Sequence, residues 1–403
     1  MKYSKEEVMQ YVAEEDVKFI RLAFCDVFGK QKNISVMPEE LPRAFDCGIA
    51  FDASAIAGFG DEARSDLFLH PDPATLAWLP WRPEHGKVVR MFCSITYPDG
   101  SPFACDTRSL LKRAISDAEA LGYSFFFGAE QEFYLFELDE KNMPTDIPYD
   151  RAGYMDVAPE DKGENVRREI CLTLEQMGIR PESSHHEEGP GQNEIDFRYT
   201  DALSAADNAM TFQTVVKTIA RRNGLFADFS AKPLSGAPGN GFHVNCSVKP
   251  DDDMQNQAGT VAGILEKIAP MTVFLNPTEK SYERLGQMKA PKFISWSKEN
   301  RSQLIRIPAA QDEFRRAELR SPDPSANPYV AFALIVRAGL YGMQNGLTLP
   351  PPVDLNLFRA DEKATENLKK LPSSLKEARE LAANDEWIKK YIPKEILDAY
   401  CKD

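Results

Sequence analysis

Acidic and apolar residues alternate in one short segment of the chain, residues 182–198 (ESSHHEEGPGQNEIDFR). In its second half, Glu194 and Asp196 alternate with Ile195 and Phe197. Successive side chains of a β-strand point to opposite faces, so this half is predicted to form a strand with one ionisable and one apolar face. The first half adds two histidines and further glutamates before a glycine-rich turn. Carboxylates and imidazoles gathered in this way are typical metal ligands.

Two more segments show the same alternation. In residues 125–136 (FFFGAEQEFYLF), Glu130 and Glu132 share one face of an otherwise apolar strand. In residues 241–248 (GFHVNCSV), His243 lies on a polar face, with phenylalanine, valine and cysteine on the other. Each strand by itself is more typical of a half-solvated sheet. However, three of the five histidines of the chain lie in such segments, which favours a shared site.

Arginines are concentrated in the C-terminal part of the chain. They are Arg284, Arg301, Arg306, Arg316 and Arg320, the last two flanking Glu318 in the segment RRAELR. Guanidinium groups suit phosphate and carboxylate, whereas clustered carboxylates with a histidine suit hard divalent cations such as Mg²⁺ or Mn²⁺. The glycine-rich turns at 189–191 and 236–241 lack the spacing of a P-loop or a dinucleotide fingerprint. Together these residues predict a site for ATP, metal and an acidic substrate.

The composition is that of an ordinary globular protein. Among 403 residues, 62 acidic and 48 basic side chains give a formal charge of −14, which argues against nucleic acid or an anionic membrane as the main partner. No segment approaches the ~18 apolar residues of a membrane span, and the first residues lack the apolar core of a signal peptide, so a cytoplasmic location is expected. The seven cysteines are scattered and form no CxxC pair, so neither a disulfide framework nor a zinc site is expected.

The elements that position these residues are predicted to form two units. Ser4 and Glu7 have the spacing of a capping box and begin a short helix. The segment YPDGSP at 97–102 contains two prolines and a glycine, which predicts a domain boundary. Strands are expected at 17–24, 33–37, 88–96, 301–308 and 315–320, and helices at 106–122, 166–177, 203–223, 258–274 and 326–343. The mixture predicts an α+β fold with domains at 1–100 and 101–403.

Over nearly its whole length the chain resembles the glutamine synthetase family. The matching motifs are FDASAIAGF (51–59), YPDGSPFACD (97–106), GAEQEFYLF (128–136), HHEEGPGQNEIDF (185–197), KPLSGAPGNGFHVN (232–245), NPTEKSYERL (276–285), ENRSQLIRIP (299–308) and RAELRSPDPSANPYVAFA (316–333). The resemblance implies a small N-terminal β-grasp domain and a large catalytic domain with a curved antiparallel sheet flanked by helices. It also implies a homo-oligomeric ring, either a hexamer or a double ring, with each active site between adjacent subunits.

The resemblance implies a particular chemistry. In the family, ATP phosphorylates the side-chain carboxylate of glutamate, and ammonia or a small amine attacks the resulting acyl phosphate. About two to three Mg²⁺ or Mn²⁺ ions per site would neutralise the phosphates and the carboxylate. One ion would be held by Glu132, Glu187 and Glu194, and another by Glu130, His243 and Glu318.

The resemblance also implies roles for the remaining residues. The nucleotide and the transferring phosphate would be bound by Arg301, Arg306 and Arg316, with Asn245 and Ser247 also at the nucleotide. Glutamate would be held by Arg284 and Arg320, together with Arg301 and Gly239. Asp52 would contribute to the ammonium site of a neighbouring subunit. Guanidinium forks suit these anions better than ammonium groups do. Asp52, Arg301, Arg320 and Lys289 would be the catalytic residues.

Lys289 is the largest departure from the family pattern. At this place the family has a glutamate, in a flap that closes the site. The glutamate accepts a proton from ammonium, and a charged lysine cannot accept a proton. Phe358 stands where some bacterial enzymes carry an adenylylated tyrosine, so that regulation cannot operate here. The leading interpretation is a glutamate–ammonia ligase. The alternatives are a γ-glutamyl ligase for another amine and a structural or regulatory homologue that binds nucleotide with little turnover.

Overall fold

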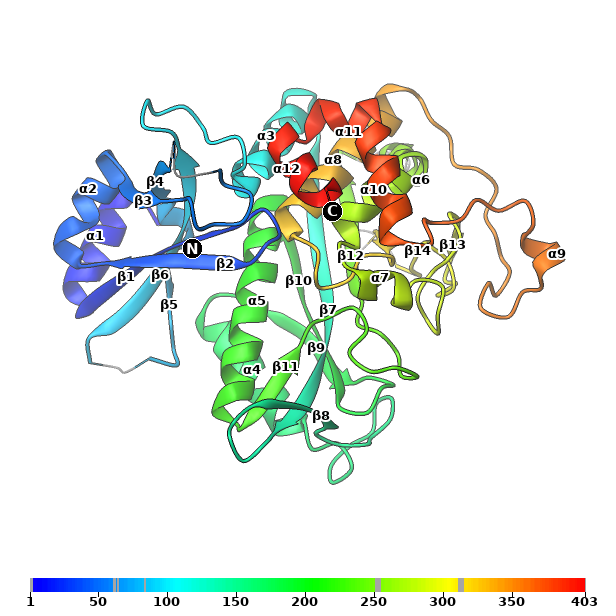
Figure 1. Cartoon of the computed structure of the whole chain (residues 1–403), viewed down its shortest axis with the longest axis horizontal. Helices are drawn as coiled ribbons and strands as arrows, with labels where there is room; N and C mark the ends of the chain where they lie inside the picture. Colours follow the sequence, from blue (N-terminus) through cyan, green and yellow to red (C-terminus); the bar gives the residue numbers. More distant parts are fainter. Residues whose placement is uncertain are drawn as a thin grey trace.

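The computed structural model describes residues 3–60, 63, 65–82, 85–250, 255–310 and 315–402. Two sheets organise these residues, a smaller N-terminal one and a larger one in the rest of the chain (Figure 1). The first predicted domain, 1–100, begins at Met1, and the second, 101–403, ends at Asp403; these two terminal residues lie outside the described ranges. One hydrophobic core runs through both parts, because buried residues of the small sheet contact the helices of the large unit.

The N-terminal sheet has the order β2-β1-β6-β4-β3, with β5 paired to β6. Its strands are β1 (Val17–Cys25), β2 (Gln31–Val36), β3 (Ile49–Asp52), β4 (Asp66–Pro71), β5 (Ala77–Trp78) and β6 (Lys87–Thr96), and its helices are α1 (Lys5–Glu14) and α2 (Leu41–Asp46). β1 and β6 are parallel, and the other described pairs are antiparallel. The predicted capping box is confirmed, because Ser4 accepts from the N–H of Glu7 and the Glu7 carboxylate accepts from the N–H of Ser4.

The large sheet has the order β13-β14-β15-β12-β7-β10-β9, with β8 and β11 also paired to β7. Its strands are β7 (Ser124–Leu138), β8 (Pro144–Pro148), β9 (Pro181–His186), β10 (Gln192–Asp201), β11 (Leu225–Asp228), β12 (Phe242–Lys249), β13 (Trp296–Lys298), β14 (Ile305–Ile307) and β15 (Ala317–Leu319). All of these pairs are antiparallel except β13 with β14. The prediction of a strand at 301–308 is wrong in length. Residues 301–304 form turns and bends, and the strand β14 begins only after them.

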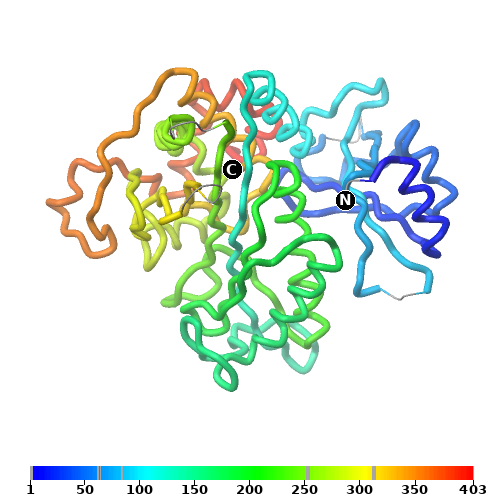
Figure 2. Tube along the Cα trace, turned by 180° about the vertical axis from the view of Figure 1, so that it is seen from behind, coloured from blue at the N-terminus to red at the C-terminus, as the bar shows by residue number. Residues whose placement is uncertain are grey.

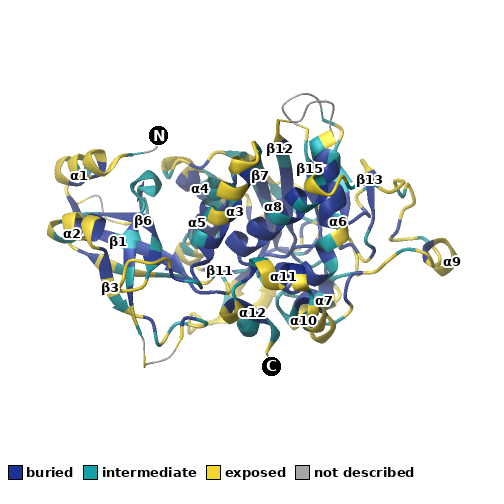
Figure 3. Ribbon diagram, turned by 90° about the horizontal axis from the view of Figure 1, so that it is seen from above, coloured by how far each residue is buried: buried dark blue, intermediate teal, exposed yellow. Residues whose placement is uncertain are grey.

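The helices of the large unit pack against its sheet or against one another, except for a short one in a projecting loop. They are α3 (Thr107–Ala120), α4 (Glu164–Gln176), α5 (Ala202–Arg222), α6 (Gln255–Leu275), α7 (Glu279–Arg284), α8 (Pro328–Gln344), α9 (Glu362–Thr365), α10 (Leu375–Asn384), α11 (Glu386–Tyr391) and α12 (Lys394–Cys401). Figure 3 shows α8 as an almost wholly buried helix, which packs against α3, α5 and α6. Its apolar sequence is thus explained by burial on several sides. The loop carrying α9 projects from the body on the side away from the N-terminal unit (Figure 2).

The expectation that no segment is long and apolar enough to span a membrane is wrong for α6. By length and composition alone α6 could do so, but 72% of the relevant window is buried inside the fold. Burial against α8 and α10 accounts for this composition.

A buried ion pair connects the two units. Arg108 at the start of α3 donates to both carboxylate oxygens of Asp207 in α5, at 2.9 and 2.8 Å, and to Asp72 of the N-terminal unit at 2.9 Å. The hydroxyl of Tyr329 donates to Asp207 at 2.7 Å. The guanidinium of Arg108 is therefore compensated by two carboxylates, as buried charges must be.

Candidate active site

The strand register places the predicted acidic residues side by side. β7 lies between β10 and β12, and Glu132 of β7 is directly opposite Glu194 of β10. Glu130 of β7 is opposite Asp196 on one side and His243 of β12 on the other. Directly opposed residues of an antiparallel pair have neighbouring side chains. The alternation seen in three separate segments thus becomes one contiguous polar surface.

A second register extends this surface toward the arginines. Glu318 of β15 lies opposite Asn245 of β12 and Arg306 of β14. Arg306 donates to one oxygen of Glu318 at 2.7 Å, and Arg320 donates to the other at 3.0 Å. Asn245 donates to Glu130 at 2.6 Å and accepts from Arg316 at 2.8 Å. The amide of Asn245 therefore connects an acidic ligand candidate to a cationic one.

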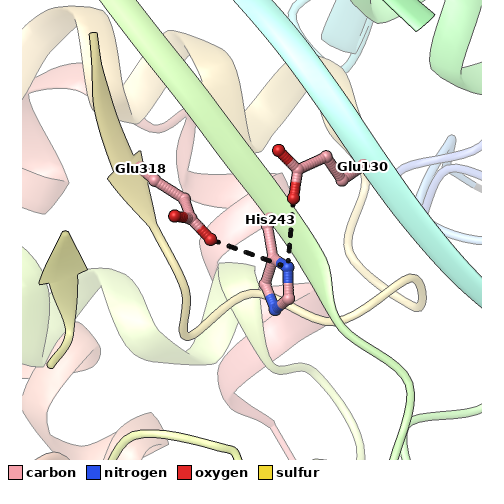
Figure 4. A group of neighbouring side chains, drawn as sticks. All are labelled: Glu130, His243 and Glu318. Atoms are coloured by element: carbon pink, nitrogen blue, oxygen red, sulfur yellow. Dashed lines mark ion pairs between the residues drawn. The ribbon is translucent and has the colours of Figure 1, made fainter. Parts of the chain in front are cut away.

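Glu130, His243 and Glu318 converge on one point (Figure 4). The Nδ1 atom of His243 is 3.5 Å from Glu130 Oε2 and 3.8 Å from Glu318 Oε1. These three residues match the predicted second metal set, and their ligand atoms are close enough to share one ion. Oxygen and imidazole donors suit Mg²⁺ or Mn²⁺.

The members of the other predicted metal set, Glu132, Glu187 and Glu194, do not form one close group among the described residues but are divided between two groups that share Glu194. Glu194 forms candidate metal groups with Glu132 and His243, and with His185 and Glu187. The Nε2 atom of His185 is 3.4 Å from Glu194 Oε1. The second oxygen of Glu132 accepts from the N–H of Gly241 at 2.7 Å, which holds this carboxylate in place.

Electrostatics show that these carboxylates lack compensating charge. Burial and repulsion by Glu132 raise the pKa of Glu187 to about 7. Burial and Glu130 likewise raise the pKa of Asp196 to about 7. Burial and Asp196 raise the pKa of Glu194 well above its ordinary value. Among the described residues, Oδ1 of Asp196 has no hydrogen-bond partner. A surplus of buried carboxylate with an unsatisfied oxygen fits divalent cations.

Glu318 is in the opposite electrostatic situation. Burial would raise the pKa of its carboxyl, but Arg320, His243 and Arg306 together lower this pKa to about 2. Glu318 is therefore ionised at any physiological pH and can serve as a permanent anionic ligand.

A buried network lies behind Glu187. His186 is hydrogen-bonded through Nε2 to Asp150 at 2.8 Å and through Nδ1 to the carbonyl oxygen of Glu187 at 2.6 Å. Burial opposes protonation, but the bond to Asp150 raises the pKa of His186 overall. Asp161 could complete a metal group with these two residues, but Arg167 already pairs with both of its oxygens. We therefore regard this network as a support for the backbone of Glu187.

Arg284 and Gly239 form the other end of the site. Arg284 is only 3% exposed, and among the described residues its hydrogen bonds go to the carbonyl oxygens of Ser321 and Arg320, not to a carboxylate. A Cβ atom on Gly239 would lie 2.4 Å from the carbonyl oxygen of Ala231 and 2.9 Å from Cγ of Arg284. Glycine is thus required at 239 because the backbone and the stem of Arg284 fill that space.

These residues surround a pocket of about 460 Å³. The predicted residues that line it are Glu130, Glu132, Glu187, Glu194, Gly239, His243, Arg284, Lys289, Arg301, Arg306, Arg316 and Arg320. Glu318 and Asn245 lie directly behind them through the bonds described above. Asp52 and Ser247 do not line the pocket. Ser247 lies further along β12, opposite Phe126, and Asp52 ends β3 in the N-terminal sheet, where it is exposed and accepts from the N–H of Ser54.

Several polar lining residues were not among the predicted site residues. They are Tyr154, Ser183, His185, Glu188, Gln192, Asp196 and Gln287. The alternation of β10 had already placed Asp196 on the same face as Glu194, so the period-two pattern could have identified it. Glu188 and Tyr154 lie in a turn and a loop, where no periodic signal exists.

Comparisons with known proteins agree with this geometry. The family profile described as glutamine synthetase, catalytic domain matches residues 104–402, and the profile of the glutamine synthetase β-grasp domain matches residues 16–98. The chain is 44% identical to a glutamine synthetase of Clostridium saccharobutylicum, covering 99% of this chain and 94% of the relative. It is 43% identical to a glutamine synthetase of Methanosarcina mazei, covering 98% and 92%.

A solved structure of a GmaS/ADP complex superposes with a TM-score of 0.88 at 27% sequence identity, covering 98% of this chain and 94% of that one. GmaS without ligand gives the same values. A two-unit α+β fold whose sheet gathers carboxylates, a histidine and arginines defines a ligase that uses a nucleotide and divalent metal ions. The chain belongs to the glutamine synthetase family, and the predicted fold class and family are confirmed.

Proposed function

We propose that this protein uses ATP to join ammonia to the γ-carboxylate of glutamate through γ-glutamyl phosphate. The observation that carries the proposal is the division of one pocket into two parts. Carboxylates with raised pKa values lie on β10 and in the turn before it, beside the carboxylates of β7, and arginines occupy the opposite side. An ATP-dependent ligase needs this division, because its metals require anionic ligands while its phosphates and substrate carboxylate require cations.

The metal ligands fit Mg²⁺ or Mn²⁺. Glu130, His243 and Glu318, which form one close group, would hold one ion. Glu132, Glu187 and Glu194, which the family resemblance suggests as the second set, are linked here only through Glu194 and would have to draw together around the other ion. When bound, such ions neutralise the phosphate oxygens and favour phosphoryl transfer. The chain itself holds the ligands in place, because β7 supplies a carboxylate to each set and the strand register fixes their separation.

The arginines would bind the anionic groups of the substrates. Arg306 and Arg316 extend from the β14–β15 side toward the metal ligands, where they would contact the nucleotide phosphates with Arg301. Arg284 and Arg320 would hold glutamate. The buried Arg284 supports this assignment, because a guanidinium with no bonded carboxylate among the described residues calls for an anionic ligand.

A second candidate function is the ligation of glutamate to a different small amine. Lys289, which would be a glutamate in the usual flap, lies at the pocket and favours this alternative. Six converging ionisable ligand candidates and the family assignment argue against a homologue without turnover.

The position of Asp52 bears on the oligomeric state. Figure 1 places β3, which ends at Asp52, in the N-terminal unit at one end of the molecule, whereas β12 and β14 lie in the large unit. Asp52 could therefore serve a site only if the N-terminal unit of one copy meets the pocket of another. We propose a homo-oligomeric ring in the cytoplasm, hexameric or doubled, built from domains at 1–100 and 101–403.

Steady-state phosphate release with ATP, glutamate and a panel of amines tests this function. Ammonium should support release that depends on all three substrates and on Mg²⁺ or Mn²⁺. Arg284→Met should raise the KM for glutamate at least tenfold, as expected for loss of about 1.4 kcal/mol or more from a charge-assisted pair. The KM for ATP should remain within twofold. Release that ignores glutamate, or that requires a different acid, would reject the proposal.

A further inference from the structure

The side chain of Lys289 connects three loops at the pocket. Lys289 belongs to the loop that follows α7, and its Nζ forms an ion pair with Oε1 of Glu188, in the turn between β9 and β10. The same Nζ lies 5.6 Å from the centroid of the Tyr154 ring, in the loop before α4. All three residues line the pocket. A single ammonium group therefore has a carboxylate and an aromatic ring as neighbours.

Glu188 differs from the other acidic residues of the pocket. Of the six acidic side chains among the described lining residues, five converge on the strand surface as candidate metal ligands. Glu188 belongs to none of those groups, and its side chain is 36% exposed. Its bonded partner is Lys289 instead of a histidine or another carboxylate. Glu188 is thus a carboxylate at the solvent side of the pocket that binds a primary ammonium.

The pair Glu188 and Tyr154 has the chemistry of a cation-binding position. A carboxylate attracts a cation by charge, and an aromatic face adds a cation–π contact when the cation is within ~6 Å of the ring centroid. Ammonium ions and small alkylamines reach an enzyme mainly as cations near neutral pH. Lys289 presents the same chemical group, so its ammonium has the contacts that an incoming acceptor would make.

The loop holds Lys289 close to this position. The N–H of Gly286 donates to the carbonyl oxygen of Pro291 at 3.1 Å, and the N–H of Ala290 donates to that of Gln287 at 3.0 Å, which closes the loop on itself. Arg320 also donates to the carbonyl oxygen of Lys289 at 3.5 Å. A tethered ammonium competes at a high effective concentration. The side chain of Lys289 is nevertheless 56% exposed, so its ion pair is weak enough for a ligand to displace.

We propose that Glu188 and Tyr154 bind the cationic amine acceptor and that Lys289 occupies this position as a tethered competitor. The inference rests on the proposed function and deepens it, because it makes Lys289 a determinant of acceptor affinity. Removing the lysine ammonium lowers the KM for a cationic acceptor and leaves the KM values for ATP and glutamate unchanged. Glu188 is required for this effect.

A double-mutant cycle tests the proposal with the full-length protein. Lys289→Met is expected to lower the KM for ammonium about two- to fivefold, the range that an exposed ion pair allows. In the Lys289→Met background, Glu188→Gln should raise that KM again. In the Glu188→Gln background, Lys289→Met should cause no further change. The matched control is Lys292→Met, which removes an exposed ammonium from the same loop that does not line the pocket.

A second acceptor separates competition by charge from simple widening of the pocket. Hydroxylamine is largely uncharged near neutral pH, so its KM should respond to Lys289→Met less than that of ammonium. Equal responses of the two acceptors would mean that the lysine acts by its bulk, and the proposal would be wrong.

Other results would also overturn it. A higher KM or a much lower kcat in Lys289→Met would show that the lysine is a working part of the site, for example by holding an acidic group of a substrate. Identical KM values in all variants would reject the competitor while leaving the proposed function intact. An absence of amine-dependent phosphate release from every form, wild type included, would reject the proposed function and this inference together.

Discussion

Glu194→Gln should stabilise the metal-free protein at alkaline pH while it abolishes turnover. Glu194 is buried between β7 and β9, and its charge is repelled first by Asp196 and then by Glu132, Glu130 and Glu187. Carboxylates that converge on a metal position repel one another when the metal is absent. Glutamine keeps the shape of the side chain and removes one of these charges.

The neighbouring Glu187 provides the magnitude. Burial, and then repulsion by Glu132, raise its pKa from 4.5 to about 7, which at about 1.36 kcal/mol per unit corresponds to about 3 kcal/mol for both causes together. A carboxyl with a raised pKa in the folded state binds more protons when folded, so metal-free stability falls as the pH rises from ~5 to ~8. Glu194→Gln removes the cost of burying one such carboxylate and its repulsion by Asp196. We expect a gain of about 1–3 kcal/mol near pH 8, or about 1–4 °C in Tm, and little gain near pH 5.

Thermal unfolding of chelator-treated protein at the two pH values measures this difference. Glu182→Gln serves as the control, because Glu182 is an exposed carboxylate on β9. Saturating Mn²⁺ at ~100 times its Kd should stabilise the wild type by about 3 kcal/mol and the variant by much less. A metal-free variant that is less stable than the wild type near pH 8, or a gain of equal size at both pH values, would refute the reasoning.

Three further outcomes are expected. The pKa of His186 is raised in the folded protein, so its protonation stabilises the fold fully below its ordinary pKa, and this stabilisation is lost as the pH rises. His186→Gln should therefore lower the free energy of unfolding, measured with urea, by more at pH ~6 than at pH ~8. An equal loss at both pH values would contradict this. Arg108→Met should lower the unfolding free energy by about 3–5 kcal/mol, since the buried Asp207 would lose its guanidinium partner and keep only the hydrogen bond from Tyr329. The exposed Arg113→Met on the same helix should have little effect. Lys289→Glu should raise ammonium-dependent phosphate release by placing negative charge at the pocket, and kinetics showing a damaged enzyme would count against it.

The sequence by itself determined the local elements. The capping box at Ser4 and the aspartate cap at Asp106 mark helix starts, because these side chains bond the nearby N–H groups of the first turn. Period-two alternation identified the polar faces of β7, β10 and β12 before any pairing was known. The family motifs then pointed to the residues that the pocket gathers.

The strand expected at 301–308 shows the limit of local patterns. Arg301 to Leu304 have no partner strand, since the pairing of β14 with β15 begins at Ile305. Similarly, Ser247 has the alternation of a site residue but lies too far along β12, and this depends on where the strand passes β7. Alternation defines which face a side chain is on, but it does not define the length of a strand or the part of the face that a pocket uses.

Only the tertiary structure decided which charges meet. Glu132 and Glu194 are far apart in the sequence, and their opposition depends on the register between β7 and β10. The pairing of Lys289 with Glu188 joins positions 101 residues apart, in a loop and a turn that have no periodic signal. Raised and lowered pKa values arise from burial and from these long-range neighbours. They follow from how strands and loops pack in space, which the order of residues along one element cannot specify.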